Sequence, residues 1–147
     1  MLLQGPRRTI VESVLPHEVS HAVFATYFGR PLPRWVEEGI CVVVEHLSPQ
    51  SELDRQIVAA LRDGNSFAVE QMFAMKNYPS DALTFYSQGY SLTRFLIERE
   101  GKSKLIQFVV EGMESDDWGS ATRKNYGFES LSDLQNAWAE WVLDLEL

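Results

Sequence analysis

The sequence predicts an all-α fold in a single domain that spans residues 1–147. Apolar side chains recur at the spacing of helices in most segments, and Ser, Asp, Gly and Pro residues mark where those segments begin and end. No strand hairpin, internal repeat or low-complexity tract interrupts this pattern. A length of 147 residues with 45% hydrophobic content is enough to form one packed core.

The first helices are expected within residues 9–28. Residues 9–12 (Thr-Ile-Val-Glu) form a capping box, in which the hydroxyl and the carboxylate satisfy backbone N–H groups, so a helix begins there. Pro16 removes one helical hydrogen bond, so we expect a kink or a new start at that point. The helix that follows has the apolar periodicity of a largely buried helix and runs to about Phe28, where Gly29 ends it.

Further helices are expected through the middle of the chain. The expected segments are a helix over residues 33–45, a helix over 51–61, a short apolar segment over 67–75, a long helix over 80–100 and a helix over 104–112. Pro33 is suited to the start of its helix because its missing N–H would have no partner there. Either Ser80 or Asp81 caps the long helix, and Gly101 stops it.

The last part of the chain is predicted to hold a loop and a final helix. Residues 112–118 are acidic and rich in turn formers, which indicates a loop with solvated carboxylates. Ser130 caps the final helix, with Asp133 at its third position. Trp138 and Trp141 belong to the apolar face of that helix, so we expect them to seal one side of the core.

Two histidines four residues apart dominate the functional interpretation. His17 and His21 of the segment His-Glu-Val-Ser-His point from one face of a helix and can close on one metal ion. Glu18 projects close to that face, near enough to take a proton from a water on the metal. The three side chains therefore indicate a hydrolytic zinc site, and the alternative is a pair of hydrogen-bonded core histidines.

A catalytic zinc ion normally takes three protein ligands, so a third donor should follow on a neighbouring element. Residues 34–39 (Arg-Trp-Val-Glu-Glu-Gly) provide one. The two segments together resemble the gluzincin metallopeptidases, zinc peptidases of the MA-like type that include thermolysin and the aminopeptidase N-like enzymes. The resemblance implies that Glu38 is the third ligand, because Glu37 falls where those aminopeptidases commonly carry Asn. The alternative for Glu38 is a solvated helix carboxylate.

The environment expected for Glu38 agrees with this assignment. The helix over residues 33–45 has an apolar face broad enough to lie inside the domain, so the Glu38 carboxylate would be buried at a cost that a zinc ion offsets. Glu45 lies seven residues beyond Glu38, about two turns, and returns to the same face. Glu45 is therefore a candidate to accept the ring N–H of a ligand histidine.

A second segment, residues 86–89 (Tyr-Ser-Gln-Gly), is similar to the Tyr-x-Lys-Gly segment of the aminopeptidase branch. By this resemblance Tyr86 donates a hydrogen bond to the oxyanion of the tetrahedral intermediate. Gln88 stands where that branch has Lys, which leaves the tyrosine chemistry intact but departs from the branch. Tyr90 is the alternative donor, and for either tyrosine the competing interpretation is packing in the core.

The resemblance implies zinc-dependent hydrolysis of a peptide bond, with Zn²⁺ as cofactor and Glu18 as general base. The Gly-x-Met-x-Asn element with which the related aminopeptidases bind a free amino terminus is absent, which favours an endopeptidase. Family members generally carry an upstream region, often β-rich, and no N-terminal β-sheet is evident here, so we expect a C-terminal portion of a longer protein or a reduced version. The alternatives are a catalytically degenerate zinc-binding domain that acts as an interaction module, and a helical scaffold without metal.

The net charge of the chain limits the classes of molecule that it can be expected to bind. The chain has 13 basic and 21 acidic residues, a net charge of −8, and no clustered basic patch, so nucleic acid and anionic membrane surfaces are poor partners. A peptide or protein substrate is the partner that the resemblance implies. No signal peptide and no apolar run approaching ~20 residues is present, so no membrane span is expected. The sequence leaves the compartment, the cleavage specificity and the oligomeric state open.

Overall fold

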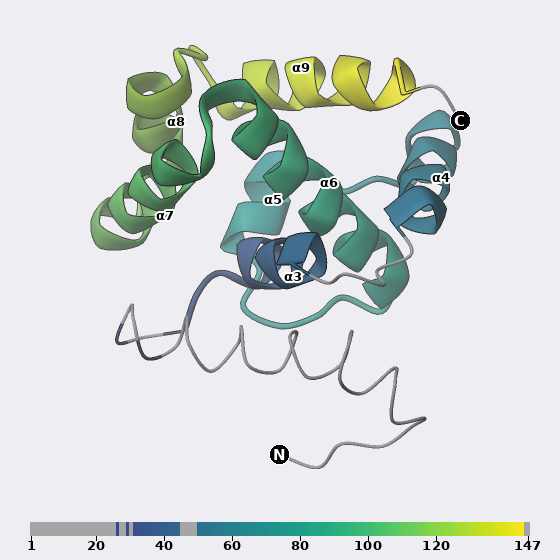
Figure 1. The fold of residues 1–147 in the computed structure, drawn as a ribbon, viewed down its shortest axis with the longest axis horizontal. Helices are drawn as coiled ribbons and strands as arrows, with labels where there is room; N and C mark the ends of the chain where they lie inside the picture. Colours follow the sequence, from purple (N-terminus) through teal and green to yellow (C-terminus); the bar gives the residue numbers. More distant parts are fainter. Residues whose placement is uncertain (1–25, 27–28, 30, 45–49, 146–147) are drawn as a thin grey trace.

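A computed structural model of the protein describes residues 26, 29, 31–44 and 50–145 (Figure 1). The described part is all-helical and contains no strand, which confirms the predicted fold class. Its helices are α3 (Arg34–Val44), α4 (Gln50–Arg62), α5 (Val69–Ala74), α6 (Ala82–Glu100), α7 (Lys102–Ser115), α8 (Trp118–Tyr126) and α9 (Leu131–Leu143). No helix in this part of the chain is both long enough and apolar enough to cross a membrane.

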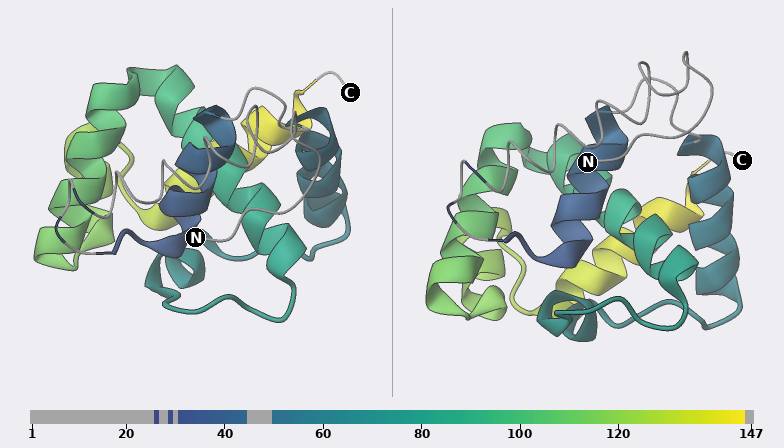
Figure 2. Two further views of the ribbon diagram at one scale, coloured as in Figure 1. Left: turned by 60° about the horizontal axis from the view of Figure 1, so that its bottom comes forward. Right: turned by 90° about the horizontal axis from the view of Figure 1, so that it is seen from below.

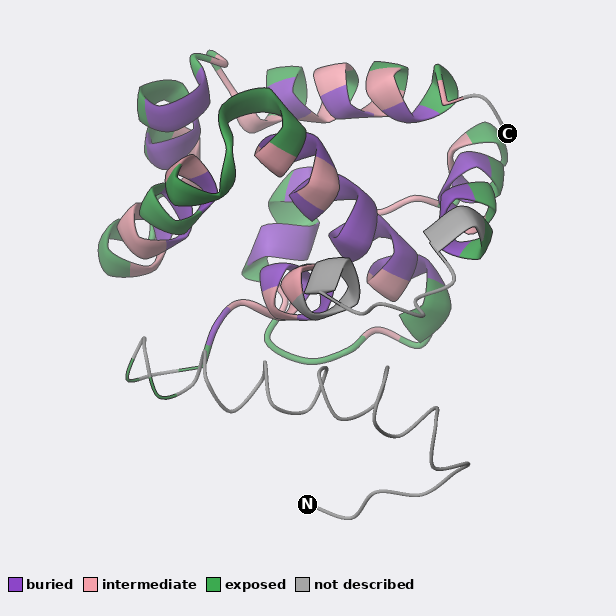
Figure 3. Cartoon of the chain, in the orientation of Figure 1, coloured by how far each residue is buried: buried purple, intermediate pink, exposed green. Residues whose placement is uncertain are grey.

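Helix α6 is the centre of the domain. It is buried along most of its length, whereas the neighbouring helices α4 and α7 each expose one face (Figure 3). It packs against α3, α4, α7 and α9. Figures 1 and 2 show α4 at one end of the molecule and the α7–α8 pair at the other, with α6 between them. The position of every other helix is therefore set largely by its contact with α6.

Local signals fix both ends of α6. The side chain of Asp81 accepts a hydrogen bond from the backbone N–H of Thr84 at 3.1 Å, so Asp81 rather than Ser80 is the cap. Gly101 ends the helix with φ of +88°, a conformation that strains any residue with a side chain. The predicted range of residues 80–100 therefore agrees with the structure to within two residues.

Helices α3 and α6 cross at very close range, and glycine makes the approach possible. A Cβ atom at Gly89 would lie 2.6 Å from the carbonyl oxygen of Trp35, and one at Gly39 would lie 2.5 Å from the carbonyl oxygen of Gly89. Real Cβ atoms do not approach backbone oxygen atoms this closely, so both positions require glycine. The two glycines end residues 34–39 and residues 86–89, two of the three segments that carry the resemblance, and the crossing brings these two together.

An aromatic cluster fills the space beside this crossing. The Trp35 ring is fully buried and stacks on Phe73 at 4.5 Å between centroids. Phe108 and Trp118 pack against the same pair, and the rings of Trp118 and Trp35 meet edge to face with 6.3 Å between centroids. These rings join α3 to α5, α7 and α8. They fix the N-terminal end of α3 in the core.

Toward the C-terminal end one expectation was wrong, and one helix was not foreseen. The predicted loop over residues 112–118 is helical as far as Ser115, because α7 continues to that residue before Asp116 adopts a left-handed turn with φ of +53°. Helix α8 was not predicted. Its residues are polar on average, but Asp117 caps it by accepting from Ser120 N at 2.9 Å.

The remaining helix boundaries lie close to those predicted from the sequence. The helices predicted over residues 33–45 and 51–61 are α3 and α4, although Glu45 lies outside the described residues. Ser130 caps α9 and accepts from Asp133 N at 3.1 Å, as predicted. Trp138 is fully buried, and the partly buried Trp141 packs on the ring of Phe95 at 5.6 Å.

Candidate active site

Glu38 places a carboxylate inside the domain. It lies on α3 beside Gly39, and its exposed fraction is 8%. This confirms the burial that the apolar face of the helix predicted. Its neighbour Glu37 has a different environment, because it forms an ion pair with Arg34 at 3.4 Å across one turn. The structure thus distinguishes the two carboxylates that the sequence offered as candidates.

Tyr78 contacts Glu38 directly. It lies in the segment between α5 and α6, and its hydroxyl donates a hydrogen bond to Oε1 of Glu38. Burial, reinforced by the bond to Glu38 and by its negative charge, raises the pKa of Tyr78 well above the usual range for a tyrosine. The phenol therefore keeps its proton at neutral pH and is the donor in this bond. Sequence reasoning missed Tyr78 because residues 77–80 carried only turn signals.

Tyr86 and Tyr90 differ in how deeply they are buried. Tyr90 is fully buried, and its hydroxyl accepts a hydrogen bond from Arg94 at 3.2 Å. Arg94 also pairs with Asp54 of α4 at 3.2 Å, so Tyr90 belongs to the network that joins α4 to α6. Tyr86 is only partly buried and packs against Tyr90 and Leu53. Of the two tyrosines, Tyr86 is the one with exposed surface.

Gln88 has a structural role. Its side chain is fully buried, its oxygen accepts from the backbone N–H of Phe67 at 2.9 Å, and its amide nitrogen donates to the Phe67 carbonyl at 2.7 Å. A lysine at this position could donate but could not accept. Gln88 therefore holds the connection between α4 and α5 against α6. This role explains why glutamine stands here in place of the lysine of the family segment.

The remaining predicted site residues lie outside the described part of the chain. These residues are His17, Glu18, His21 and Glu45. Within the described ranges, no group of three or more His, Cys, Asp or Glu side chains could hold a metal ion. The one predicted ligand that is described suits zinc chemically, because Glu38 is a buried carboxylate with one oxygen oriented by a phenol.

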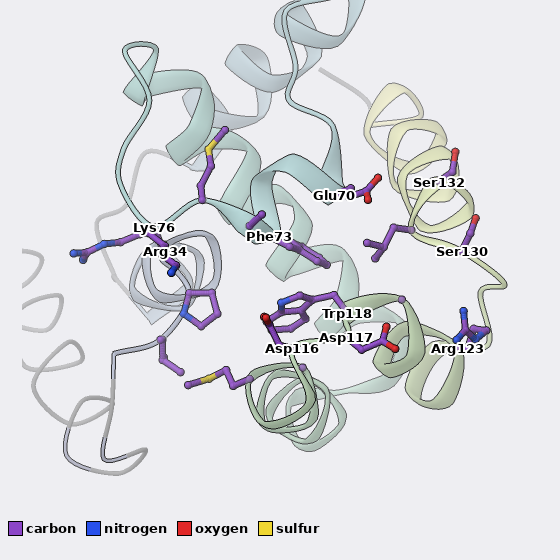
Figure 4. A pocket seen from close by; sticks show the side chains of 18 of the residues that line it. Arg34, Glu70, Phe73, Lys76, Asp116, Asp117, Trp118, Arg123, Ser130 and Ser132 are labelled. Atoms are coloured by element: carbon purple, nitrogen blue, oxygen red, sulfur yellow. The ribbon is translucent and has the colours of Figure 1, made fainter.

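A groove of about 1130 Å³ opens beside the N-terminal end of α3 (Figure 4). Phe73 and Trp118 form its apolar floor, Arg34 and Lys76 lie together at one end, and Arg123 lies at the other. Arg34 belongs to both the groove and the Glu38 site, because its guanidinium also lies 5.5 Å from the Tyr78 ring centroid. Arg34 thus connects the groove to Tyr78, whereas Glu38 itself is not among the residues that line the groove.

Comparison with known families classifies the chain. A family model described as the peptidase MA superfamily matches residues 2–144, which is nearly the whole length. The chain belongs to the peptidase MA superfamily. This confirms the MA-like part of the resemblance, and the narrower gluzincin assignment stays a prediction. Members of the peptidase MA superfamily are typically metal-dependent, and the chain has a domain of this peptidase-like kind.

A curated relative in the comparison is much longer than this member of the superfamily. Protein DA1 of Arabidopsis thaliana is 25% identical over 127 residues, which cover 74% of this chain and 23% of DA1. The chain thus spans about a quarter of the length of that relative. No solved structure matches the chain. The superfamily assignment therefore rests on the family model.

Proposed function

We propose that the protein is a zinc-dependent peptidase that hydrolyses internal peptide bonds. The observation that supports this most strongly is the buried Glu38 carboxylate, held by Tyr78 on a helix that crosses the Tyr86 helix at a pair of glycines. A carboxylate is a common zinc ligand, and a zinc ion bound there would offset part of the cost of burying it. Members of the peptidase MA superfamily are typically metal-dependent, which supports a metal at this position.

His17, His21 and Glu38 are the proposed ligands, and Glu45 is proposed to accept the ring N–H of one histidine. When bound, zinc lowers the pKa of the attacking water toward neutrality and polarises the substrate carbonyl. Glu18 takes the proton of that water as its oxygen bonds to the carbonyl carbon. Glu18 then passes the proton to the leaving amine as the C–N bond breaks.

Tyr86 is proposed to donate a hydrogen bond to the oxygen of the carbonyl as negative charge develops there. Its partial exposure at the start of α6 supports this role over one for the buried Tyr90. The groove supports an extended peptide as substrate, because its volume of about 1130 Å³ and its apolar floor offer room for several residues at the N-terminal end of the helix that carries Glu38. A chain bound there would not need a free amino terminus, in agreement with an endopeptidase.

The experiment that tests this proposal separates metal binding from chemistry. Glu18→Gln removes the base and leaves the three proposed ligands in place. We expect the variant to keep its zinc and to lose roughly 10²–10⁴-fold in kcat/KM on an internally quenched peptide blocked at both ends. Zinc content is measured by elemental analysis of the same preparation.

A Glu18→Gln variant that hydrolyses the peptide as fast as the wild type would remove Glu18 from the role of base. A wild type that holds zinc but cleaves no peptide in a mixed library would favour the interaction module instead. Cleavage restricted to peptides with a free amino terminus would replace the endopeptidase assignment by an exopeptidase one.

A further inference from the structure

Tyr78 links the segment before α6 to the proposed metal ligand on α3. Its hydroxyl donates to Glu38 Oε1, although the two residues are 40 positions apart in the sequence. The Glu38 side chain is 8% exposed, so the phenol bonds to a carboxylate that is largely removed from solvent. A hydrogen bond of this kind orients the carboxylate before any metal arrives.

The Tyr78 ring is itself held in place from two sides. The Phe85 ring meets it edge to face, with 5.8 Å between centroids and an interplanar angle of 88°. The Arg34 guanidinium lies 5.5 Å from its centroid and is anchored by Glu37 at 3.4 Å. The direction of the hydroxyl is therefore set by packing, even though 46% of Tyr78 is exposed.

We propose that Tyr78 is a positioning residue that holds the Glu38 carboxylate in the orientation needed to bind zinc, an inference that rests on the proposed peptidase function. A glutamate side chain has several rotatable bonds, and fixing it costs conformational entropy at the moment of binding. Tyr78 and the packing around it fix the carboxylate in advance, as outer hydrogen bonds to metal ligands do in other zinc sites.

Tyr78→Phe tests this role because it keeps the ring against Phe85 and Arg34 and removes only the hydroxyl. The zinc dissociation constant is measured by competition with a chromophoric chelator, without any substrate. We expect binding to weaken by roughly 10–100-fold, the usual effect of losing such a bond. The thermal unfolding midpoint in excess chelator should stay close to that of the wild type.

Tyr126→Phe is the matched control. Tyr126 is 6% exposed, and its hydroxyl has no hydrogen-bond partner within the described ranges. Removing that hydroxyl should leave zinc affinity unchanged. Equal affinities of wild type and Tyr78→Phe would overturn the role of Tyr78 and leave the peptidase proposal standing, whereas a wild type that binds no zinc would overturn both.

A double-mutant cycle shows whether Tyr78 acts through Glu38. In a Glu38→Gln background the carboxylate that Tyr78 orients is gone, so adding Tyr78→Phe should weaken zinc binding much less than it does in the wild type. Fully additive effects on zinc affinity would show that Tyr78 acts on another group, and would overturn the inference.

Discussion

Two helix pairs in the molecule use a buried glycine in different ways. In the α3–α6 pair, Gly89 lets two backbones approach, and a Cβ there would lie 2.6 Å from the Trp35 carbonyl oxygen. In the α7–α8 pair, a Cβ at Gly112 would meet the ring of Trp118. The first glycine brings together segments far apart in the sequence, whereas the second accommodates a side chain six residues away.

The polar contacts made by residues of the two pairs also differ in sequence separation. Glu38 of α3 bonds to Tyr78, in the segment before α6, across 40 positions. In the α7–α8 pair, Asn125 donates to Glu111 at 2.8 Å and to Ala121 at 2.9 Å, both within 14 positions. The α7–α8 pair is thus a local unit that supports the fold. The α3–α6 pair assembles distant residues, and the proposed site lies there.

The largest effect on stability is expected in the α7–α8 pair. Phe108 is fully buried, and its ring contacts Trp118 at 5.4 Å and Tyr126 at 5.3 Å. Phe108→Ala should lower the free energy of unfolding by about 3–5 kcal/mol, measured by urea titration. Because Phe108 also packs against Trp35 of α3, with 6.4 Å between ring centroids, the folded fraction should lose some zinc-binding free energy, but less than the protein loses in stability. If the free energy of zinc binding falls by more than the free energy of unfolding, the α3–α6 pair and the α7–α8 pair are not independent.

The two glycines allow a matched comparison. Gly89→Ala and Gly112→Ala each insert one methyl group into a packed contact and should each cost about 1–3 kcal/mol of unfolding free energy. Gly89→Ala displaces the helix that carries Glu38 directly, whereas Gly112→Ala moves Trp118, which packs on Trp35 of that helix, so Gly89→Ala should weaken zinc binding more. Isothermal titration with zinc on both variants checks this. Equal zinc affinities of the two variants would show that the close approach of α3 and α6 does not affect the site.

A smaller effect is expected at the start of α8. Asp117 accepts a hydrogen bond from Ser120 N at 2.9 Å, and Asp117→Ala removes this cap. The unfolding free energy should fall by about 1 kcal/mol with no change in zinc affinity. Thermal unfolding and a chelator competition on the same sample measure both. Reduced zinc affinity would contradict the separation of the α7–α8 pair from the site.

The smallest effect is a dependence of stability on pH, caused by Asp81 at the start of α6. Hydrogen bonds from the side chain and the backbone N–H of Thr84 lower the pKa of Asp81 below its ordinary value of 3.8. The folded state therefore gains stability from ionised Asp81 above that value and loses it as pH falls through the lower pKa of the folded state.

Asp81→Asn keeps a cap that does not titrate, so its melting temperature should fall less than that of the wild type between pH 5 and pH 2.5. Melting curves recorded across this range measure the difference. Parallel acid profiles for the two proteins would contradict the cap assignment.

Much of the fold could be predicted because its signals are local. Asp81, Gly101 and Ser130 act on backbone groups within a few residues of themselves, so the ends of α6 and the start of α9 followed from the sequence. Helix α8 escaped prediction because it lacks a clear apolar stripe and is held by its cap and by Trp118, which packs on rings from α3, α5 and α7.

The site was predictable only in part, for a related reason. The burial of Glu38 followed from the apolar positions around it on one helix. Its bond to Tyr78 did not, because the contact joins an irregular segment to a helix 40 positions away and leaves no periodic pattern. The double hydrogen bond of Gln88 to Phe67 was hidden for the same reason, since it depends on tertiary packing.

The central claim is that Glu38 binds zinc together with His17 and His21. The most direct test is the zinc content of wild type, Glu38→Gln and Glu37→Gln, purified without chelator and analysed side by side. The account predicts equimolar zinc in the wild type and in Glu37→Gln, because Glu37 pairs with Arg34, and strongly reduced zinc in Glu38→Gln. A wild type without zinc, or equal zinc in all three proteins, would contradict it.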